Sequence, residues 1–274
     1  MGNIEISVVM GVFNPENEEQ LFQSVTSIIN QSFQKWELFI YNDGSLEQYE
    51  KLFQKISYMD KRIIYIRSVE NKGLSYALNQ CIKKANGRYI ARMDGDDISV
   101  PRRLDTLYQF LETHSEYQWV GSNAELIDTE GAWGCEKMQK VPRTQDFLRY
   151  SPYIHPAVMF RKEILEQSQG YCVSELTRRC EDYELFMRLH RAGYQGYNIQ
   201  ENLLLYREDE KGYQRRLYRY YIREMLIRYQ GFRGLGLLKM KNMPYVLRPL
   251  LAGLIPSKII LYIKGLREKE YERS

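Results

Sequence analysis

Residues 88–105, RYIARMDGDDISVPRRLD, carry the strongest signal in the sequence, because an apolar strand-like run passes directly into three carboxylates. Asp94, Asp96 and Asp97 occupy three of the four positions 94–97. Carboxylates this close repel one another when all are ionised, so a cation is expected between them. Oxygen ligands of this kind favour Mg²⁺ or Mn²⁺ over zinc or copper. The stretch therefore predicts a divalent-cation site at the end of a buried strand.

On either side of this stretch, strand-like and helix-like segments alternate. Four strand-like runs, Ile6 to Phe13, Trp36 to Tyr41, Ile63 to Arg67 and Tyr89 to Met93, are each followed by apolar residues at helical spacing. This alternation predicts an α/β fold with a Rossmann-like, mostly parallel sheet and helices on both faces. Ligands of such sheets bind at the carboxyl ends of the strands. Residues 42–45 and the three aspartates both follow strands, so we expect them to line one crevice.

The pattern divides the chain into three parts. Residues 1–120 form the alternating half, and residues 121–210 look like a mixed sub-domain of shorter strands around a helix from about Glu181 to Ala192. Residues 211–274 carry a net charge of +11, whereas residues 1–210 carry −7. This tail also contains apolar residues at helical spacing, which predicts a basic amphipathic helical segment that binds an acidic surface. Its longest uncharged run, Pro249 to Ser257, is too short to span a bilayer.

Composition and cysteine spacing indicate an ordinary globular protein. The chain has 274 residues, of which 44% are hydrophobic and 27% charged. Cys81, Cys135, Cys172 and Cys180 show no C-x-x-C spacing, and no apolar leader precedes Ile6. We therefore expect neither a zinc site, a disulfide framework nor secretion, but a reducing cytoplasmic setting.

Six short motifs follow one another along residues 4–210. They are Ile6-Ser7-Val8-Val9-Met10, Asn42-Asp43-Gly44-Ser45, Asn71-Lys72-Gly73-Leu74-Ser75, Ala91-Arg92-Met93-Asp94-Gly95-Asp96-Asp97, His155-Pro156 and Glu181-Asp182-Tyr183-Glu184-Leu185. No single motif is specific, but the ordered set is. It resembles family 2 glycosyltransferases of the GT-A fold, of the type that builds bacterial capsule, O-antigen and exopolysaccharide.

The resemblance implies a nucleotide-sugar site. Asp43 is implied to contact the nucleotide base, although an Asx turn between strand and helix explains it equally well from the residues alone. Asn71 and Gly73 open a helix whose N-terminus favours anionic groups, which also fits a simple cap. Asp94 is expected at the ribose or at a metal-bound water, and Arg103 at a phosphate, which suits a guanidinium fork. Arg92 is interpreted as an ion-pair partner of the acidic cluster.

The implied cofactor is Mn²⁺ or Mg²⁺, which offsets the negative charge that develops on a departing nucleoside diphosphate. Asp96 and Asp94 form the D-x-D element that would hold it, and Asp97 fits a second-sphere group or a helix cap. Relatives often carry Tyr-Arg-x-His later in the chain. Here residues 206–209 place Asp209 at the histidine position. A carboxylate there is a competent metal ligand, so Asp209 is a third candidate.

The resemblance also implies the residues that act on the acceptor. Asp182 is implied to be the base that deprotonates the acceptor hydroxyl in one inverting displacement, and Glu181 to hold the acceptor or position Asp182. Carboxylates in a first helical turn also occur for dipole reasons alone. His155 is expected near the acceptor, although a single histidine is equally often structural.

We therefore expect a metal-dependent, inverting hexosyltransferase that moves a sugar from a nucleotide-sugar, expected to be a UDP-sugar, to a glycan or lipid-linked acceptor. Its tail is expected to hold it peripherally on the anionic inner face of the cell membrane. The alternative is a catalytically silent relative that binds sugar nucleotides, membrane or nucleic acid. Nucleic acid is disfavoured because no recognisable RNA or DNA module accompanies the basic tail. Neither G-x-G-x-x-G after the first strand nor a P-loop is present, which disfavours a dehydrogenase or nucleotidase.

Overall fold

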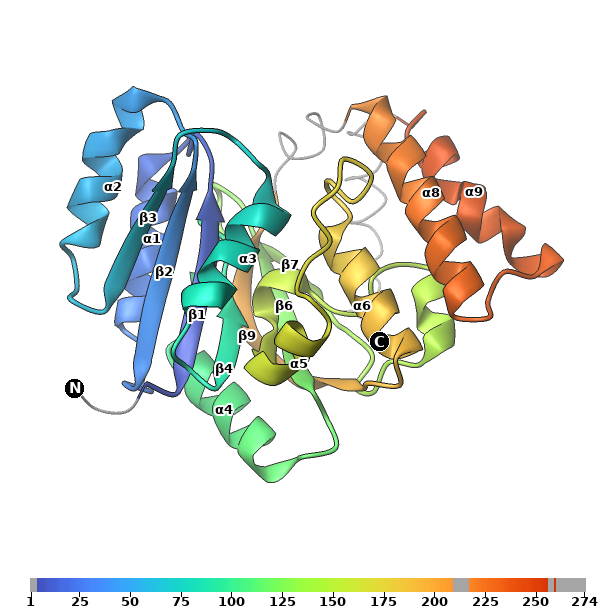
Figure 1. Cartoon of the computed structure of the whole chain (residues 1–274), viewed down its shortest axis with the longest axis horizontal. Helices are drawn as coiled ribbons and strands as arrows, with labels where there is room; N and C mark the ends of the chain where they lie inside the picture. Colours follow the sequence, from blue (N-terminus) through green and yellow to red (C-terminus); the bar gives the residue numbers. More distant parts are fainter. Residues whose placement is uncertain (1–3, 209–216, 256–258, 260–274) are drawn as a thin grey trace.

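The computed structural model describes residues 4–208, 217–255 and 259 (Figure 1). In these residues nine strands form one continuous sheet with the order β3-β2-β1-β4-β8-β6-β9-β5, and β7 pairs with β6. The strands are β1 (Ile6–Val12), β2 (Trp36–Asp43), β3 (Ile63–Ser68), β4 (Tyr89–Arg92), β5 (Ile98–Ser99), β6 (Trp119–Ile127), β7 (Ala132–Glu136), β8 (Met159–Arg161) and β9 (Gly196–Arg207).

Two layers of helices cover the sheet, one on each face. One apolar cluster takes in buried residues of α1, α2 and α4, and the other takes in buried residues of α3, α5, α6 and α8. The predicted α/β architecture with helices on both faces is therefore confirmed. The helices are α1 (Glu18–Ile29), α2 (Glu50–Ser57), α3 (Leu74–Lys84), α4 (Arg103–Thr113), α5 (Lys162–Gln167), α6 (Glu181–Arg191), α8 (Tyr218–Gly234) and α9 (Met243–Ala252).

The first four strands form the parallel part of the sheet. β1 lies between β2 and β4, and β2 pairs with β3, all in parallel. Along β1, Val8 and Met10 belong to one apolar cluster and Val9 to the other, as the two-residue period of a strand requires. Burial on both faces explains why these strands read as unbroken apolar runs. Their carboxyl ends meet at one edge, where the segments after β2 and β4 begin.

The second half of the sheet is mixed and grows directly from the first. β8 pairs antiparallel with β4 and with β6, and β9 runs parallel to β6. The boundary expected after residue 120 falls inside β6, and the strands within residues 4–208 share one sheet. Strand β6 is continuous over Trp119–Ile127, with a register irregularity against β9 around Asn123. The sequence analysis did not predict β5, β7 or α5.

The basic C-terminal segment is helical in its described part, as predicted, but α8 is not a free surface helix. Ile227 and Phe232 of α8 lie in the same apolar cluster as Phe186 of α6. The guanidinium group of Arg228 is buried and donates to the carbonyl oxygens of Leu148 (3.0 Å) and Arg149 (3.3 Å). Figure 1 shows α6, α8 and α9 side by side. Long-range burial thus makes α8 part of the hydrophobic core.

No helix within residues 4–208 and 217–255 combines the length and the apolar character that a membrane crossing requires.

Candidate active site

Three carboxylates meet where the chain leaves β4. One ligand oxygen from each of Asp94, Asp96 and Asp97 lies within 4.8 Å of the others. Asp97 is buried, Asp94 is half-buried and Asp96 is exposed. Asp97 Oδ2 is buried and has no hydrogen-bond partner among the residues that the structure describes. A buried, unsatisfied carboxylate oxygen beside two further carboxylates fits a hard divalent cation.

Arg92 holds the first of these carboxylates from beneath. Its side chain is almost fully buried, and Nη2 lies 2.6 Å from Asp94 Oδ1. Nη1 donates to the carbonyl oxygen of Met93. Ser24 of α1 donates its hydroxyl to the carbonyl oxygen of Asp94 at 2.7 Å. The interpretation of Arg92 as an ion-pair partner is confirmed, and the loop is fixed from two sides.

The end of β9 reaches the same loop. The backbone N–H of Arg207 donates to Asp97 Oδ1 (2.8 Å), and its Nε donates to the carbonyl oxygen of Asp96 (3.0 Å). The segment that carries the departure from the family pattern therefore lies against the acidic cluster, although Asp209 itself is outside the described residues. The sequence analysis missed Arg207, whose only signal was its place in that segment.

The crowding of charge changes how these carboxylates ionise. The pKa of Asp96 is raised to about 6, first by desolvation and then by the charge of Asp94. The pKa of Asp97 is raised well above its ordinary value by burial and by the charges of Asp96 and Asp94. Both shifts disfavour three negative charges in one place, which a cation would compensate.

Arg103 corrects the sequence-based expectation of a phosphate contact. It is fully buried, and its Nη2 donates to the carbonyl oxygens of Arg92 (2.6 Å) and Pro156 (2.7 Å). Burial lowers its pKa to about 10. Its guanidinium fork therefore joins the strand before the aspartates to the His155-Pro156 turn and is not available to a phosphate.

The other residues predicted to lie at the nucleotide form one junction after β2 and β3. Asp43 is buried, and its two carboxylate oxygens accept from the backbone N–H groups of Lys72 (2.9 Å) and Gly73 (2.7 Å). Asn71 donates its amide to the carbonyl oxygen of Asp43 at 3.1 Å. Gly73 has φ of 89°, a value that glycine adopts readily, and precedes α3. Asp43 thus fixes the loop at the start of α3.

The predicted catalytic pair lies in the first turn of α6. Glu181 and Asp182 are both partly buried. The pKa of Glu181 is raised to about 7, mainly by burial and then by the charge of Asp182. Burial also raises the pKa of Asp182, while the backbone N–H of Tyr183 and the positive charge of Arg92 act against the increase. A carboxylate with a raised pKa is a stronger base, as proton abstraction requires.

Tyr171 lies near both groups of carboxylates. Burial raises the pKa of its hydroxyl, and the charges of Asp182, Glu181 and Asp94 add to the increase. The carboxylate pair and the aspartate cluster are therefore close enough to act electrostatically on one hydroxyl group. His155 Nε2 lies 2.7 Å from Tyr171 Oη. The sequence analysis missed Tyr171, because the chain separates it from every motif.

The same environment keeps His155 neutral. Its ring is buried, and burial together with the positive charge of Arg92 puts its pKa well below the ordinary value. The described contacts therefore give the His155 ring a hydrogen-bond partner in Tyr171 and no contact with the predicted base.

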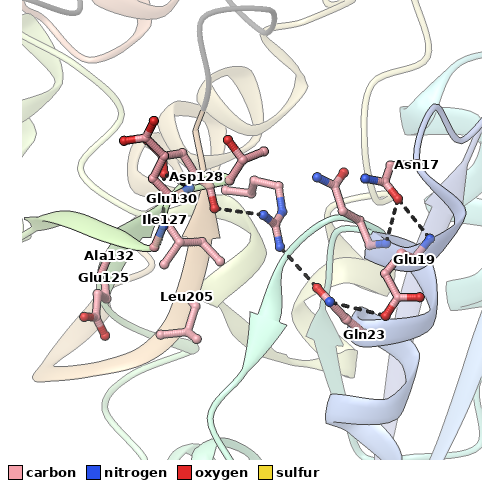
Figure 2. Close-up of a pocket in the computed structure, with 13 residues that line it drawn as sticks. Asn17, Glu19, Gln23, Glu125, Ile127, Asp128, Glu130, Ala132 and Leu205 are labelled. Carbon is pink, nitrogen blue, oxygen red and sulfur yellow. Dashed lines mark hydrogen bonds between the residues drawn. The ribbon is translucent and has the colours of Figure 1, made fainter.

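A cavity of about 540 Å³ lies on the other side of Arg207, between the start of α1 and the β6–β7 turn. Figure 2 shows Gln23 and Asp128 facing each other across it. Arg207 spans the gap, because its Nη1 donates to the carbonyl oxygen of Asp128 and its Nη2 to Gln23 Oε1. Four carboxylates and one arginine line this cavity, and the carboxylates belong to Glu19, Glu125, Asp128 and Glu130. This excess of negative charge repels a nucleoside diphosphate.

Residues 7–168 match the family model described as Glycosyl transferase family 2. The chain belongs to this family. EpsE of Bacillus subtilis (strain 168), which is named as a glycosyltransferase, is 35% identical over 257 residues, covering 93% of this chain and 91% of EpsE. The O-antigen biosynthesis glycosyltransferase WbnJ of Escherichia coli is 31% identical over 223 residues, covering 79% of this chain and 84% of WbnJ.

Solved structures show that this family 2 glycosyltransferase has the GT-A fold, as the resemblance implied. S. aureus TarS 1–349 in complex with UDP-GlcNAc matches with a TM-score of 0.66 and 15% identity, covering 91% of this chain and 80% of TarS. The mannosyltransferase PcManGT of Pyrobaculum calidifontis, in complex with GDP-Man and Mn²⁺, matches with a TM-score of 0.62 and 16% identity. Its alignment covers 96% of this chain and 79% of PcManGT.

Proposed function

We propose that this family 2 glycosyltransferase moves a sugar from a UDP-sugar to a glycan or lipid-linked acceptor, with inversion at the anomeric carbon. The observation that carries the proposal is a series of contacts from the aspartate loop to α6. Arg103 donates to the carbonyl oxygens of Arg92 and Pro156, and His155 contacts the hydroxyl of Tyr171. Arg188 of α6 donates to the carbonyl oxygen of Gly170, next to Tyr171. The charges of both carboxylate groups also reach the Tyr171 hydroxyl. A metal-binding group and a base near one another are what a single displacement needs.

Asp94 and Asp96 would hold Mn²⁺ or Mg²⁺, with Asp97 beside them and Asp209 as a further candidate ligand. The cation supplies positive charge that stabilises the diphosphate leaving group. The nucleotide would lie toward Asp43, Asn71 and Gly73, at the ends of β2 and β3. The complexes of TarS with UDP-GlcNAc and of PcManGT with GDP-Man and Mn²⁺ support this assignment.

Asp182 would accept the proton of the acceptor hydroxyl. As that oxygen bonds to the anomeric carbon, the bond from this carbon to the diphosphate oxygen breaks, and one such displacement inverts the configuration. Glu181 would orient the acceptor or Asp182. His155 supports this side of the crevice through Tyr171.

The setting that we propose is cell-surface polysaccharide synthesis on the cytoplasmic face of the membrane. WbnJ is named for O-antigen biosynthesis and AmsE of Erwinia amylovora for amylovoran biosynthesis. Four apolar side chains of α9 and the turn after it are exposed, and they lie at helical spacing: Leu247, Leu251, Leu254 and Ile255. With the positive charge of the tail, this row fits an anionic membrane surface. Flotation with anionic vesicles tests the assignment, and Leu251→Glu is expected to weaken it.

A thermal-shift panel tests the donor assignment, because a ligand that binds the native state raises the melting temperature. UDP-sugars are expected to raise it with Mn²⁺ and to raise it less without the metal. An equal shift with and without Mn²⁺ would contradict the cation site. A catalytically silent relative would show the shift but would release no UDP when acceptors are added. Intact carboxylates on both sides of the crevice favour the enzyme.

A further inference from the structure

Four arginines gather beside the crevice, outside the residues assigned above. Arg178 and Arg179 lie in the loop just before α6, and Arg219 and Arg223 lie one turn apart on α8. We call these four residues the arginine cluster. In Figure 1 the start of α6 and the start of α8 lie toward the same end of the molecule as the start of α3.

Two residues join the loop to α8. Glu175 Oε1 lies 3.3 Å from Arg178 Nη1, and its Oε2 lies 2.7 Å from Arg223 Nη2. The ring of Tyr220 lies under both α8 arginines, at 5.3 Å from the guanidinium carbon of Arg219 and 5.4 Å from that of Arg223. The cluster thus joins two segments that lie 40 residues apart in the sequence, Arg178-Arg179 and the start of α8.

The positive charge of the cluster exceeds its compensation. Within residues 4–208 and 217–255, Glu175 is the one carboxylate that forms a salt bridge with any of the four arginines. Arg223 Nη1 is buried and has no hydrogen-bond partner in the described part of the chain. The pKa of Tyr220 is lowered by its hydrogen bond with Arg219 and by the charges of Arg219, Arg179 and Arg178. All these features indicate a place for an anion.

The cluster lies between the two halves of the active site. Arg178 Nη2 donates to Asn71 Oδ1 at 2.8 Å, so the loop reaches the junction before α3. Two residues after Arg179, the same loop becomes the carboxylate pair of α6. Arg179 has φ of 71°, in the left-handed region, and such backbone strain persists where surrounding structure enforces it.

An apolar row lies next to the arginines on α8. Four exposed side chains follow one another at helical spacing: Tyr218, Ile222, Leu226 and Tyr229. Each of the first two precedes a cluster arginine by one residue, which places the apolar row about 100° around the helix from Arg219 and Arg223. A ligand that contacts both the two arginines and the apolar row of α8 would carry negative charge at one end and a hydrocarbon chain at the other.

Resting on the proposed glycosyl transfer, we infer that the arginine cluster binds the diphosphate of a lipid-linked acceptor, with the hydrocarbon chain along the apolar row of α8. Guanidinium groups suit diphosphate oxygens because their forks form paired charge-assisted hydrogen bonds. The diphosphate of the donor is proposed to bind the cation at Asp94 and Asp96. The arginine cluster can therefore bind the diphosphate of the acceptor. The acceptor sugar then extends from the diphosphate toward Asp182.

The test uses the full-length protein and measures binding of farnesyl diphosphate, farnesol and inorganic pyrophosphate by titration calorimetry in detergent micelles. Arg179→Gln/Arg219→Gln removes two exposed charges and leaves the Glu175 salt bridges in place. We expect about tenfold or greater weakening of farnesyl diphosphate binding, since each lost charged hydrogen bond is worth about 1.5 kcal/mol or more. Arg233→Gln/Lys241→Gln removes two exposed charges elsewhere in the tail and is expected to change nothing.

Three results would overturn the inference: unchanged farnesyl diphosphate binding in the cluster variant, equal weakening in the control pair, or pyrophosphate binding as tight as that of farnesyl diphosphate. Binding of UDP in the presence of Mn²⁺ shows whether the arginines belong to the acceptor site or to the donor site. The affinity of the protein for UDP is expected to stay the same in both variants. A loss of this affinity in the cluster variant would assign the arginines to the donor site. If the wild type binds no nucleotide sugar, the proposed function fails, whatever farnesyl diphosphate does.

Discussion

The acidic crevice and the basic helices α8 and α9 show two different relations between sequence and structure. The crevice is made of short motifs, each next to the end of a strand or the start of a helix, and the topology of the sheet brings them together. The α8 helix looked from its composition like a surface tail, yet Ile227 and Phe232 are buried against the core. Local chemistry thus marked the crevice, whereas only packing revealed the role of α8.

The strongest test of the crevice is Asp182→Asn. Loss of the base is expected to lower kcat by about 10²–10⁴-fold, the usual contribution of general acid–base catalysis. The affinity for a UDP-sugar with Mn²⁺ is expected to stay unchanged, because the aspartate cluster is untouched. Single-turnover transfer assays and calorimetry measure the two quantities. Turnover close to wild type would remove Asp182 as the base.

A matched control is Glu184→Gln on the same turn of α6. Glu184 forms an ion pair with Arg188 at 2.7 Å and takes no part in the proposed chemistry. This variant is expected to keep its activity.

Phe232→Ala tests whether α8 belongs to the core. The ring is fully buried, so its truncation is expected to lower the free energy of unfolding by about 3–5 kcal/mol. Leu251→Ala on α9 is the control, because that side chain is 66% exposed and its loss is expected to cost little. Chemical denaturation measures both. Similar, small decreases in the free energy of unfolding in the two variants would show that α8 is a surface helix and not part of the core.

Asp96→Ala tests the cation site itself. We expect Mn²⁺-dependent affinity for a UDP-sugar to fall by at least about tenfold, since loss of even an outer-shell partner costs that much. Glu125→Gln, in the neighbouring cavity, is expected to leave this affinity unchanged. If Mn²⁺ still enhances donor binding fully in Asp96→Ala, the ligands lie elsewhere.

The smallest effect concerns the pH dependence of kcat/KM. The base Asp182 acts only when deprotonated, and burial raises its pKa, so activity is expected to fall on the acidic side at a higher pH than for an exposed aspartate. The pKa of the neighbouring Glu181 is raised to about 7, in part by the charge of Asp182. In Glu181→Gln the acidic limb is expected to remain, because Asp182 is the titrating base. Loss of the limb in that variant would show that Glu181 sets it.

Much of the fold was predictable from the sequence because burial on both faces imposes unbroken apolar runs on β1 to β4. The short β5 and the exposed β7 carry little such signal. The contacts of the arginines near the aspartates could not be predicted from the sequence either. Arg92 and Arg103 have the same side chain, but one binds Asp94 and the other binds two backbone carbonyls. Which of these occurs depends on where β8 and the His155-Pro156 turn pass.

The sequence by itself determined the family, the α/β architecture and the residues at the strand ends, because these depend on adjacent residues and on periodicity. Only the tertiary structure decided that Tyr171 contacts His155, that Arg207 fixes the aspartate loop, and that α8 brings arginines to the start of α6. Each of these contacts joins segments that are distant in the chain. Their formation depends on how sheet and helices pack, which no local pattern encodes.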